Sequence, residues 1–224
     1  MMPRTIVYLP ESQLTDIPEE ILDLLLVKKL SLHQNHIKII APKIGQLITL
    51  THLNLSYNVI EFLPPEIGRL VLLEKLVVHD NQLQTLPSEI GRLGKLTYLD
   101  LADNQIHTLP PEIGQLKNLK TLDLMGNKIQ SLPREMGQLE QLYKLTLSDN
   151  GLDTLPAAVL QIKNLEMLNL LHNKIESFPV GIAQLDKLLY ISFTRGLVSN
   201  SIVNQLKWLL PKTKIILQDE TDVF

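Results

Sequence analysis

Acidic side chains recur in the middle of this 224-residue chain at one fixed spacing. Asp80 and Asp103 are 23 residues apart, and so are Asp100 and Asp123. Carboxylates can act as general acids and bases, can hold a metal ion together with a histidine such as His79, or can attract a basic surface. The elements that position these side chains decide which of the three chemistries is available.

The same spacing extends along almost the whole chain. Blocks of 23 residues begin at Arg4 and follow one another eight times without an insertion, up to residue 187. Within a block, positions 4 and 6 are Leu or Val, position 9 is Asn in every block except the first, and position 15 is Pro in seven of the eight. Such regularity is typical of a repeat protein, in which each unit buries its apolar side chains against its neighbours.

Each block predicts one strand and one short helical turn. Apolar residues at positions 4 and 6 alternate with polar ones, as in a strand with one buried face. The Asn at position 9 can bond to backbone groups where the chain leaves the strand, and the stacked amides should form a ladder. The Pro at position 15 suits the first residue of a helical turn, and Gly at position 19 of five blocks allows close packing between units. A helix N-terminus also favours the acidic residues found there, namely Glu20, Glu66, Glu89, Glu112 and Glu135.

The sequence therefore predicts an α/β solenoid with a parallel β-sheet on the concave face and short helical or 3-10 turns on the convex face. The pattern LxxLxLxxNxIxxLPxxIGxL resembles the 23-residue class of leucine-rich repeat, whose solenoid is a horseshoe. The gap-free run of units most resembles the small leucine-rich repeat proteins of Leptospira-type bacteria. The same repeat length also occurs in intracellular eukaryotic scaffolds that bind small GTPases.

The pattern divides the chain into three parts: eight repeats at residues 4–187, a degenerate ninth repeat with a capping helix at 188–217, and a tail at 218–224. In the ninth repeat Gly196 replaces the Asn. The stretch SNSIVNQLKWLLP that follows has serine N-caps, an apolar stripe and a terminal proline, which predict a helix at about residues 200–210. Residues 214–217 can add a last strand, and we expect Trp208 to pack within this C-terminal cap.

Bulk composition narrows the function classes. The net charge of −3 and the pI of about 6.1 give no basic excess that would draw the chain to nucleic acid. No apolar run approaches the ~18 residues of a membrane span, and the N-terminal MMPRTIVYLP lacks the apolar core of a signal peptide. The chain has no cysteine, which excludes both a thiol nucleophile and the disulfide-bonded end caps of extracellular eukaryotic leucine-rich repeat domains.

In this architecture, the outward strand positions 3, 5 and 7 and the following position 8 line the concave face. These columns vary from repeat to repeat, whereas the core columns do not. Nine strands with three outward side chains each would present roughly 27 residues, the size of a standard protein interface. The candidate partner-binding residues come from these columns: Tyr57, His79, Asp80, Tyr98, Asp100, Asp103, Asp123, Met125 and Asp149.

Some of these side chains have structural alternatives. Asp80, Asp103 and Asp149 immediately precede the Asn of their repeats, where a turn-forming Asp helps the chain to bend. Asp100 and Asp123 lie in mid-strand, where Asp is unfavourable and like charges on adjacent strands oppose stability, which favours a functional role. Tyrosine suits strands as well as interfaces.

An open concave sheet offers no water-excluding pocket, so we expect no catalytic residue, no enzyme activity and no cofactor. His79, Asp80 and Asp103 can be imagined around a metal ion, but they form no dedicated motif, and we expect no metal site. The interpretation that remains is a non-enzymatic module for protein–protein recognition, whose acidic concave face attracts a basic surface of a partner protein.

Two uses of such a module compete, and both follow from the family resemblance. An exported or cell-surface bacterial protein would recognise a host surface or matrix protein. A cytoplasmic scaffold or regulatory subunit would bind a GTPase or a phosphatase. In both cases we expect a monomer, or a weak homodimer formed through the open edge of the first strand, where Pro10 limits pairing.

Overall fold

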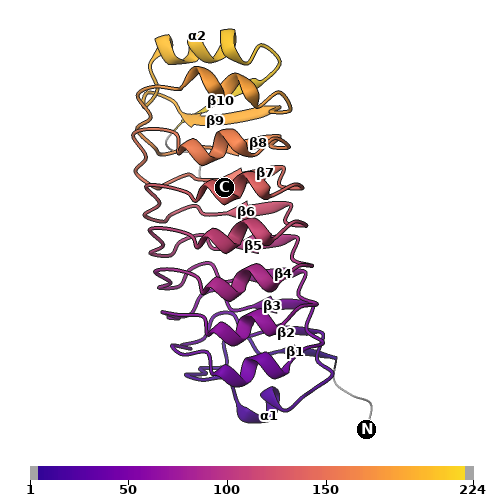
Figure 1. The fold of residues 1–224 in the computed structure, drawn as a ribbon. Coiled ribbons are helices and arrows are strands. Elements are labelled where there is room, and N and C mark those ends of the chain that lie inside the picture. The colour runs from indigo at the N-terminus through magenta and orange to yellow at the C-terminus, as the bar shows by residue number, and fades with distance from the viewer. Residues whose placement is uncertain (1–4, 220–224) are drawn as a thin grey trace.

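A computed structural model of the chain describes residues 5–219 as a stack of coils, with strands on one side and short helices on the other (Figure 1). Ten parallel strands form one sheet, and each strand pairs with its neighbours in sequence. The predicted parallel sheet is confirmed. The strands are β1 (Ile6–Tyr8), β2 (Lys29–Ser31), β3 (His52–Asn54), β4 (Lys75–Val77), β5 (Tyr98–Asp100), β6 (Thr121–Asp123), β7 (Lys144–Thr146), β8 (Met167–Asn169), β9 (Tyr190–Thr194) and β10 (Lys214–Gln218).

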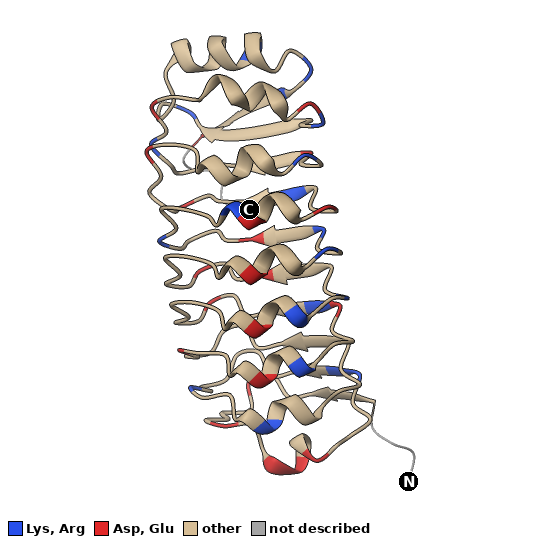
Figure 2. Ribbon diagram, viewed as in Figure 1, with Lys and Arg blue, Asp and Glu red and all other residues tan. Residues whose placement is uncertain are grey.

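The convex side consists of one short helix per repeat, as predicted. These are the α-helix α1 (Glu19–Leu22) and the 3-10 helices η1 (Pro42–Gln46), η2 (Pro65–Arg69), η3 (Ser88–Arg92), η4 (Pro111–Gln115), η5 (Arg134–Gln138), η6 (Ala157–Gln161) and η7 (Val180–Gln184). The predicted glutamates occupy the first turns of α1 and of η2 to η5, where they form a column along the convex face (Figure 2).

The prediction for the proline at position 15 is wrong by one residue. Pro64 is not the first residue of η2 but the residue before it, with an extended backbone at φ −70° and ψ 152°. Its carbonyl accepts the Ile67 N–H at 3.0 Å and so closes the first 3-10 turn. A proline fits there because its fixed φ suits extended backbone as well as a helix.

Each repeat places the same set of apolar side chains in the core. In the fifth repeat Leu99, Leu101, Ile106, Ile113 and Leu116 are fully buried. The strands pair in register with a shift of 23 residues, so that Leu99 lies beside Leu76 and Leu122. The core is therefore a stack of equivalent layers, and each layer is covered by the next.

The glycine at position 19 allows this close stacking. A Cβ atom added to Gly68 would lie 2.5 Å from the backbone oxygen of Glu89 in the next repeat. Ordinary side chains do not tolerate such an approach, so glycine lets neighbouring helices of the convex face touch through their backbones. The close packing predicted for this column is confirmed.

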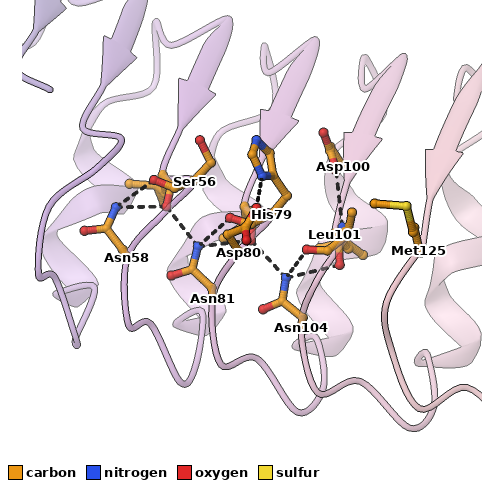
Figure 3. Close-up of polar contacts among 12 residues, drawn as sticks. Ser56, Asn58, His79, Asp80, Asn81, Asp100, Leu101, Asn104 and Met125 are labelled. Atoms are coloured by element: carbon orange, nitrogen blue, oxygen red, sulfur yellow. Dashed lines mark hydrogen bonds and ion pairs between the residues drawn. The ribbon is translucent and has the colours of Figure 1, made fainter. Parts of the chain in front are cut away.

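The asparagines at position 9 form the predicted ladder, of which Figure 3 shows three rungs. The Asn104 side chain donates from Nδ2 to the carbonyls of Val78, Leu101 and Ala102 at 3.0–3.1 Å. Its Oδ1 accepts the Leu83 N–H at 2.9 Å. Because Val78 and Leu83 belong to the preceding repeat, each amide joins its own repeat to the one before.

The C-terminal end of the stack is covered by α2 (Asn200–Leu209), the topmost helix in Figure 1. The Ser199 hydroxyl caps it by accepting the Ile202 N–H at 3.3 Å. Ile202, Val203, Leu206 and Leu209 on this helix are buried. The strand β10 then pairs with β9 and becomes the last strand of the sheet.

Trp208 does not pack within the cap, so that prediction is wrong. Its side chain is 78% exposed, the highest value among the large apolar residues described. The buried stripe of α2 contains Leu206 and Leu209, and a residue two positions after Leu206 is rotated by about 200° to the opposite face of a helix. The face of α2 that covers the core therefore excludes the tryptophan.

At the other end, β1 is an edge strand of the sheet. Ile6 and Tyr8 on this strand are 61% and 64% exposed. Pro10 lies beyond the end of β1, in the following turn, rather than on the strand itself. Within residues 5–219, no helix has the length and apolar character that a bilayer crossing requires.

Candidate partner-binding face

Strand alternation builds the concave face. In β5, Leu99 is buried in the core, while Tyr98 and Asp100 on either side of it point outward and are partly exposed. The nine predicted site residues occupy β5, β6 and the turns after β3 to β7. The structure brings five of them into direct contacts that we call the concave cluster: Tyr57, His79, Asp80, Tyr98 and Asp100.

The first part of the concave cluster joins two repeats through aromatic rings. The rings of Tyr57 and His79 meet edge to face, with their centroids 4.8 Å apart. The His79 Nδ1 atom lies 2.7 Å from Asp80 Oδ2, and Figure 3 shows this contact beside the ladder. Both contacts hold the His79 ring in place, so this part of the face is ordered before any partner binds.

The second part of the concave cluster lies on β5. The Tyr98 hydroxyl donates to Asp100 Oδ2 at 3.3 Å, and Lys75 Nζ lies 4.4 Å from the centroid of the Tyr98 ring. Burial, followed by the nearby Asp100 carboxylate, raises the pKa of Tyr98 to about 12. The phenol is therefore a hydrogen-bond donor at neutral pH.

Asp100 and Asp123 each have a structural role that the sequence did not suggest. Their Oδ1 atoms accept the backbone N–H groups of Ala102 and Met125, two residues further on, at 3.2 and 3.0 Å. The same bond is made in other repeats by neutral side chains at the same position, Asn54 and Asn169. The bond thus explains why a side chain with an Oδ1 acceptor occupies this position, but it does not explain the negative charge of Asp100 and Asp123.

The charges of Asp100 and Asp123 oppose each other. The two residues are directly paired on β5 and β6, as predicted from the repeat spacing. Burial, and to a lesser extent the Asp100 carboxylate, raise the pKa of Asp123 above its ordinary value of 3.8. Two carboxylates in this arrangement cost folding free energy that a bound cationic group would recover.

At position 8 the structure supports the turn interpretation. Asp80, Asp103 and Asp149 have left-handed backbones with φ between 51° and 54°. The other repeats adopt the same conformation with different residues, namely Glu11, Gln34, Tyr57, Gly126 and His172. The conformation is therefore a property of the repeat, and Asp is one of several side chains that occupy it.

Four of the nine predicted residues lie outside the concave cluster, toward the C-terminal half of the face: Asp103, Asp123, Met125 and Asp149. Burial and the neighbouring Asp80 raise the pKa of Asp103, and Asp149 adds to this effect from further away. Met125 follows β6, and its carbonyl accepts the Asp103 N–H at 2.8 Å. Asp149 is exposed beyond β7. Within the part of the chain that the structure describes, no group of three or more His, Asp or Glu could hold a metal ion.

The estimate of roughly 27 outward side chains, three from each of nine strands, is too high. Several side chains at positions 5 and 7 are small or apolar and are buried between larger neighbours. They are Ser56, Val77, Ala102, Thr146, Ser148, Leu171 and Thr194, each at most 8% exposed. On average, each strand accordingly presents fewer than three accessible side chains.

The structure also places a row of basic side chains beside the concave cluster. Lys29, His52 and Lys75 occupy position 3 of three consecutive repeats and are paired in register on β2, β3 and β4. The row can be recognised in the sequence, because no other three consecutive repeats have basic residues at position 3. These three residues were not among the predicted partner-binding residues.

Comparison with known families identifies the repeat. Residues 26–83 and 140–195 match the family model described as leucine rich repeat, and residues 89–150 match the model described as leucine-rich repeat region. The chain is a leucine-rich repeat protein. A sequence search against curated proteins gives no match.

Solved structures share the fold of this leucine-rich repeat protein. The plant peptide hormone receptor RGFR1, in complex with RGF2, is 29% identical, with a TM-score of 0.72 over 95% of this chain and 35% of the receptor chain. The Arabidopsis receptor kinase HAESA, in complex with the peptide hormone IDA and the co-receptor SERK1, is 28% identical, with a TM-score of 0.71 over 86% of this chain and 35% of the other. This protein spans about a third of the length of those receptor chains.

The leucine-rich repeat domain of the type III effector XopL has a higher TM-score of 0.82, at 20% identity, over 97% of this chain and 77% of that domain. At that level of identity the likeness concerns the fold alone. It agrees with the solenoid of parallel strands and 3-10 turns seen here.

Proposed function

We propose that this leucine-rich repeat protein is a non-enzymatic recognition module that binds a partner protein through its concave face. One observation carries the proposal: Asp100 and Asp123 bear charges that the fold does not need. Asn54 and Asn169 make the same backbone bond without a charge, so the two paired carboxylates cost stability without a structural return. A basic group of a partner would compensate that cost.

The remaining predicted residues suit the same role. Tyr57, His79 and Tyr98 provide rigid aromatic area beside the carboxylates, and aromatic side chains are enriched at protein interfaces. Asp80, Asp103 and Asp149 extend the negative potential along the face, while Met125 adds an apolar contact. The two plant receptors with this fold bind peptide hormones, which supports a peptide or protein ligand here as well.

For the use of this module we propose recognition of a host surface or matrix protein by an exported bacterial protein. This finer proposal rests on the resemblance of the gap-free repeats to the small Leptospira-type proteins. An intracellular scaffold that binds a GTPase or a phosphatase is the alternative.

Affinity capture tests the proposal. Wild-type protein and the Asp100→Asn/Asp123→Asn variant are offered to host-cell extract, serum and bacterial lysate, and the retained proteins are identified by mass spectrometry. The substitution keeps the backbone bonds and removes two charges. A matched control, Asp153→Asn/Asp186→Asn, removes two charges from exposed loop positions outside the concave face.

We expect a partner that wild type and control retain equally and that the concave variant binds at least tenfold more weakly, because each lost charge pair contributes about 1 kcal/mol in water. A partner from serum or host-cell extract supports host recognition, and one recovered only from bacterial lysate supports the intracellular scaffold. Equal retention by all three proteins would show that the acidic concave face is not the binding surface.

A further inference from the structure

The basic row borders a hollow in the N-terminal half of the concave face. Lys29, His52 and Lys75 line a cavity of about 450 Å³ together with Ser31, Asn54 and Val77. Adjacent strands are about 4.8 Å apart, so the three basic side chains can reach one small group together.

In the part of the chain that the structure describes, the two lysines of this row have no carboxylate paired with them, although both side chains are exposed. The contact with the Tyr98 ring holds the Lys75 ammonium at the wall of the hollow. Asp100, which also lines the hollow from β5, already accepts hydrogen bonds from the Tyr98 hydroxyl and the Ala102 N–H.

The hydrogen bonds of His52 determine which ring nitrogen can serve a ligand. The Thr51 hydroxyl donates its one hydrogen to the Lys28 carbonyl at 2.9 Å. Toward His52 Nδ1, also 2.9 Å away, the hydroxyl oxygen must therefore accept, so the ring donates from Nδ1. The Nε2 atom is left to gain or lose the titrating proton.

Four influences act on that proton. Burial, then Lys29, and more weakly Lys75 lower the pKa of His52, and Glu74 opposes them. Burial and the positive charges of the row therefore both favour the neutral form of the ring. An anion placed among the three residues would reverse this effect, and Nε2–H would become an additional donor to it.

We propose that the hollow is a subsite for an anionic group of the partner, a carboxylate or a phosphate, held by Lys29, His52 and Lys75. The inference deepens the proposed function and rests on it. The middle of the row lies two to three strands from the Asp100 and Asp123 pair, or about 12 Å along the sheet. The partner surface should thus carry an acidic and a basic group at that separation.

The test uses inorganic phosphate and acetate as probes. The His52 ring resonances, assigned with a His52→Gln variant, are followed by NMR during titration with each salt and with sodium chloride at matched ionic strength. We expect a saturable shift with phosphate or acetate, together with a rise in the pKa of His52. The tighter of the two probes indicates whether the partner supplies a phosphate or a carboxylate.

The Lys29→Gln/Lys75→Gln variant should weaken binding about fivefold for each lysine, the effect of one unit charge at about 4 Å in water. The control variant Lys128→Gln/Lys174→Gln removes the same charge from exposed positions beyond the strands and should leave binding unchanged. A response to chloride equal to that for both probes, or full binding by the Lys29 and Lys75 variant, would overturn the subsite.

The wild-type titration against chloride decides the matter even if a variant does not fold. The test is also independent of affinity capture. Anion binding together with equal capture by wild type, concave variant and control would refute the proposed function, and the hollow would then bind anions without a role in partner recognition. A captured partner without any anion response would refute only the subsite.

Discussion

Replacing one ladder amide should cost several times more stability than replacing an exposed asparagine. Asn104→Ala removes four hydrogen bonds from a residue that is 7% exposed. The control, Asn118→Ala, removes an exposed amide whose Nδ2 donates to the Gly94 carbonyl. Both substitutions remove the same side-chain atoms. Asn104→Ala removes them from the buried ladder, and Asn118→Ala removes them from the surface.

The magnitude follows from which groups keep a partner. The Leu83 N–H loses the Asn104 acceptor inside the core, which costs about 1–3 kcal/mol. The three carbonyls lose one donor each but keep another: Val78 bonds to Asn81, Leu101 to Asn127, and Ala102 to the Asp80 N–H. With about 0.5 kcal/mol for each of these, the total loss is about 2.5–4.5 kcal/mol.

Urea unfolding followed by far-ultraviolet circular dichroism measures both variants against wild type. We expect the free energy of unfolding to fall by about 2.5–4.5 kcal/mol for Asn104→Ala and by less than about 0.5 kcal/mol for Asn118→Ala. A difference between the two variants below about 1 kcal/mol would mean that water replaces the ladder amide, and the structural reasoning would be refuted.

Three further predictions concern packing, charge and exposure. Gly68→Ala should lower stability by about 1–3 kcal/mol because its Cβ meets the Glu89 backbone, whereas Gly94→Ala, with open space around it, should not lower it; urea midpoints of the pair test this. Because the folded pKa of Asp123 is raised, the folded state binds more protons than the unfolded state, so this group lowers stability as pH rises above 3.8. Asp123→Asn should therefore be more stable than wild type by a few tenths to about 1 kcal/mol at pH 7. The same difference in stability between variant and wild type at pH 7 and at pH 3 would contradict this. Trp208→Ala should change stability by less than about 0.5 kcal/mol, and the wild-type fluorescence maximum should be that of a solvated indole; a blue-shifted maximum would place the ring in the cap instead.

Most of the fold was predictable from sequence because one strand and one short helix recur in each repeat. One apolar column can be ambiguous, but positions 4 and 6 recur eight times with the asparagine at a fixed distance from them. The failures arose where a residue depends on details within one repeat. The placement of the position-15 proline, exemplified by Pro64, depended on a 3-10 turn that closes onto the residue before it.

The candidate site was predictable only in part. The pairing of Asp100 with Asp123 follows from the period, and the structure shows it. The backbone bonds of these aspartates were not foreseen, although Asn54 and Asn169 in the same column were a visible hint. The contact of Tyr57 with His79 depends on the left-handed backbone of Tyr57, which a pattern of residue types does not specify.

Trp208 shows how a rare residue type can mislead. A single tryptophan in an apolar helix suggests burial, yet the spacing of Leu206 and Leu209 already indicated which face was covered. The basic row was likewise readable as a column. In both cases the position within the periodic pattern carried more information than the residue type alone.

The ladder also gives the chain an order in time. Each repeat leaves one N–H, such as that of Leu83, to be accepted by an asparagine that lies 21 residues later. On a ribosome, where the N-terminal part emerges first, the newest repeat therefore remains incomplete until the following one is synthesised. Each new repeat supplies the amide that the repeat before it needs. The series ends where Gly196 supplies no amide and α2 covers the last repeat.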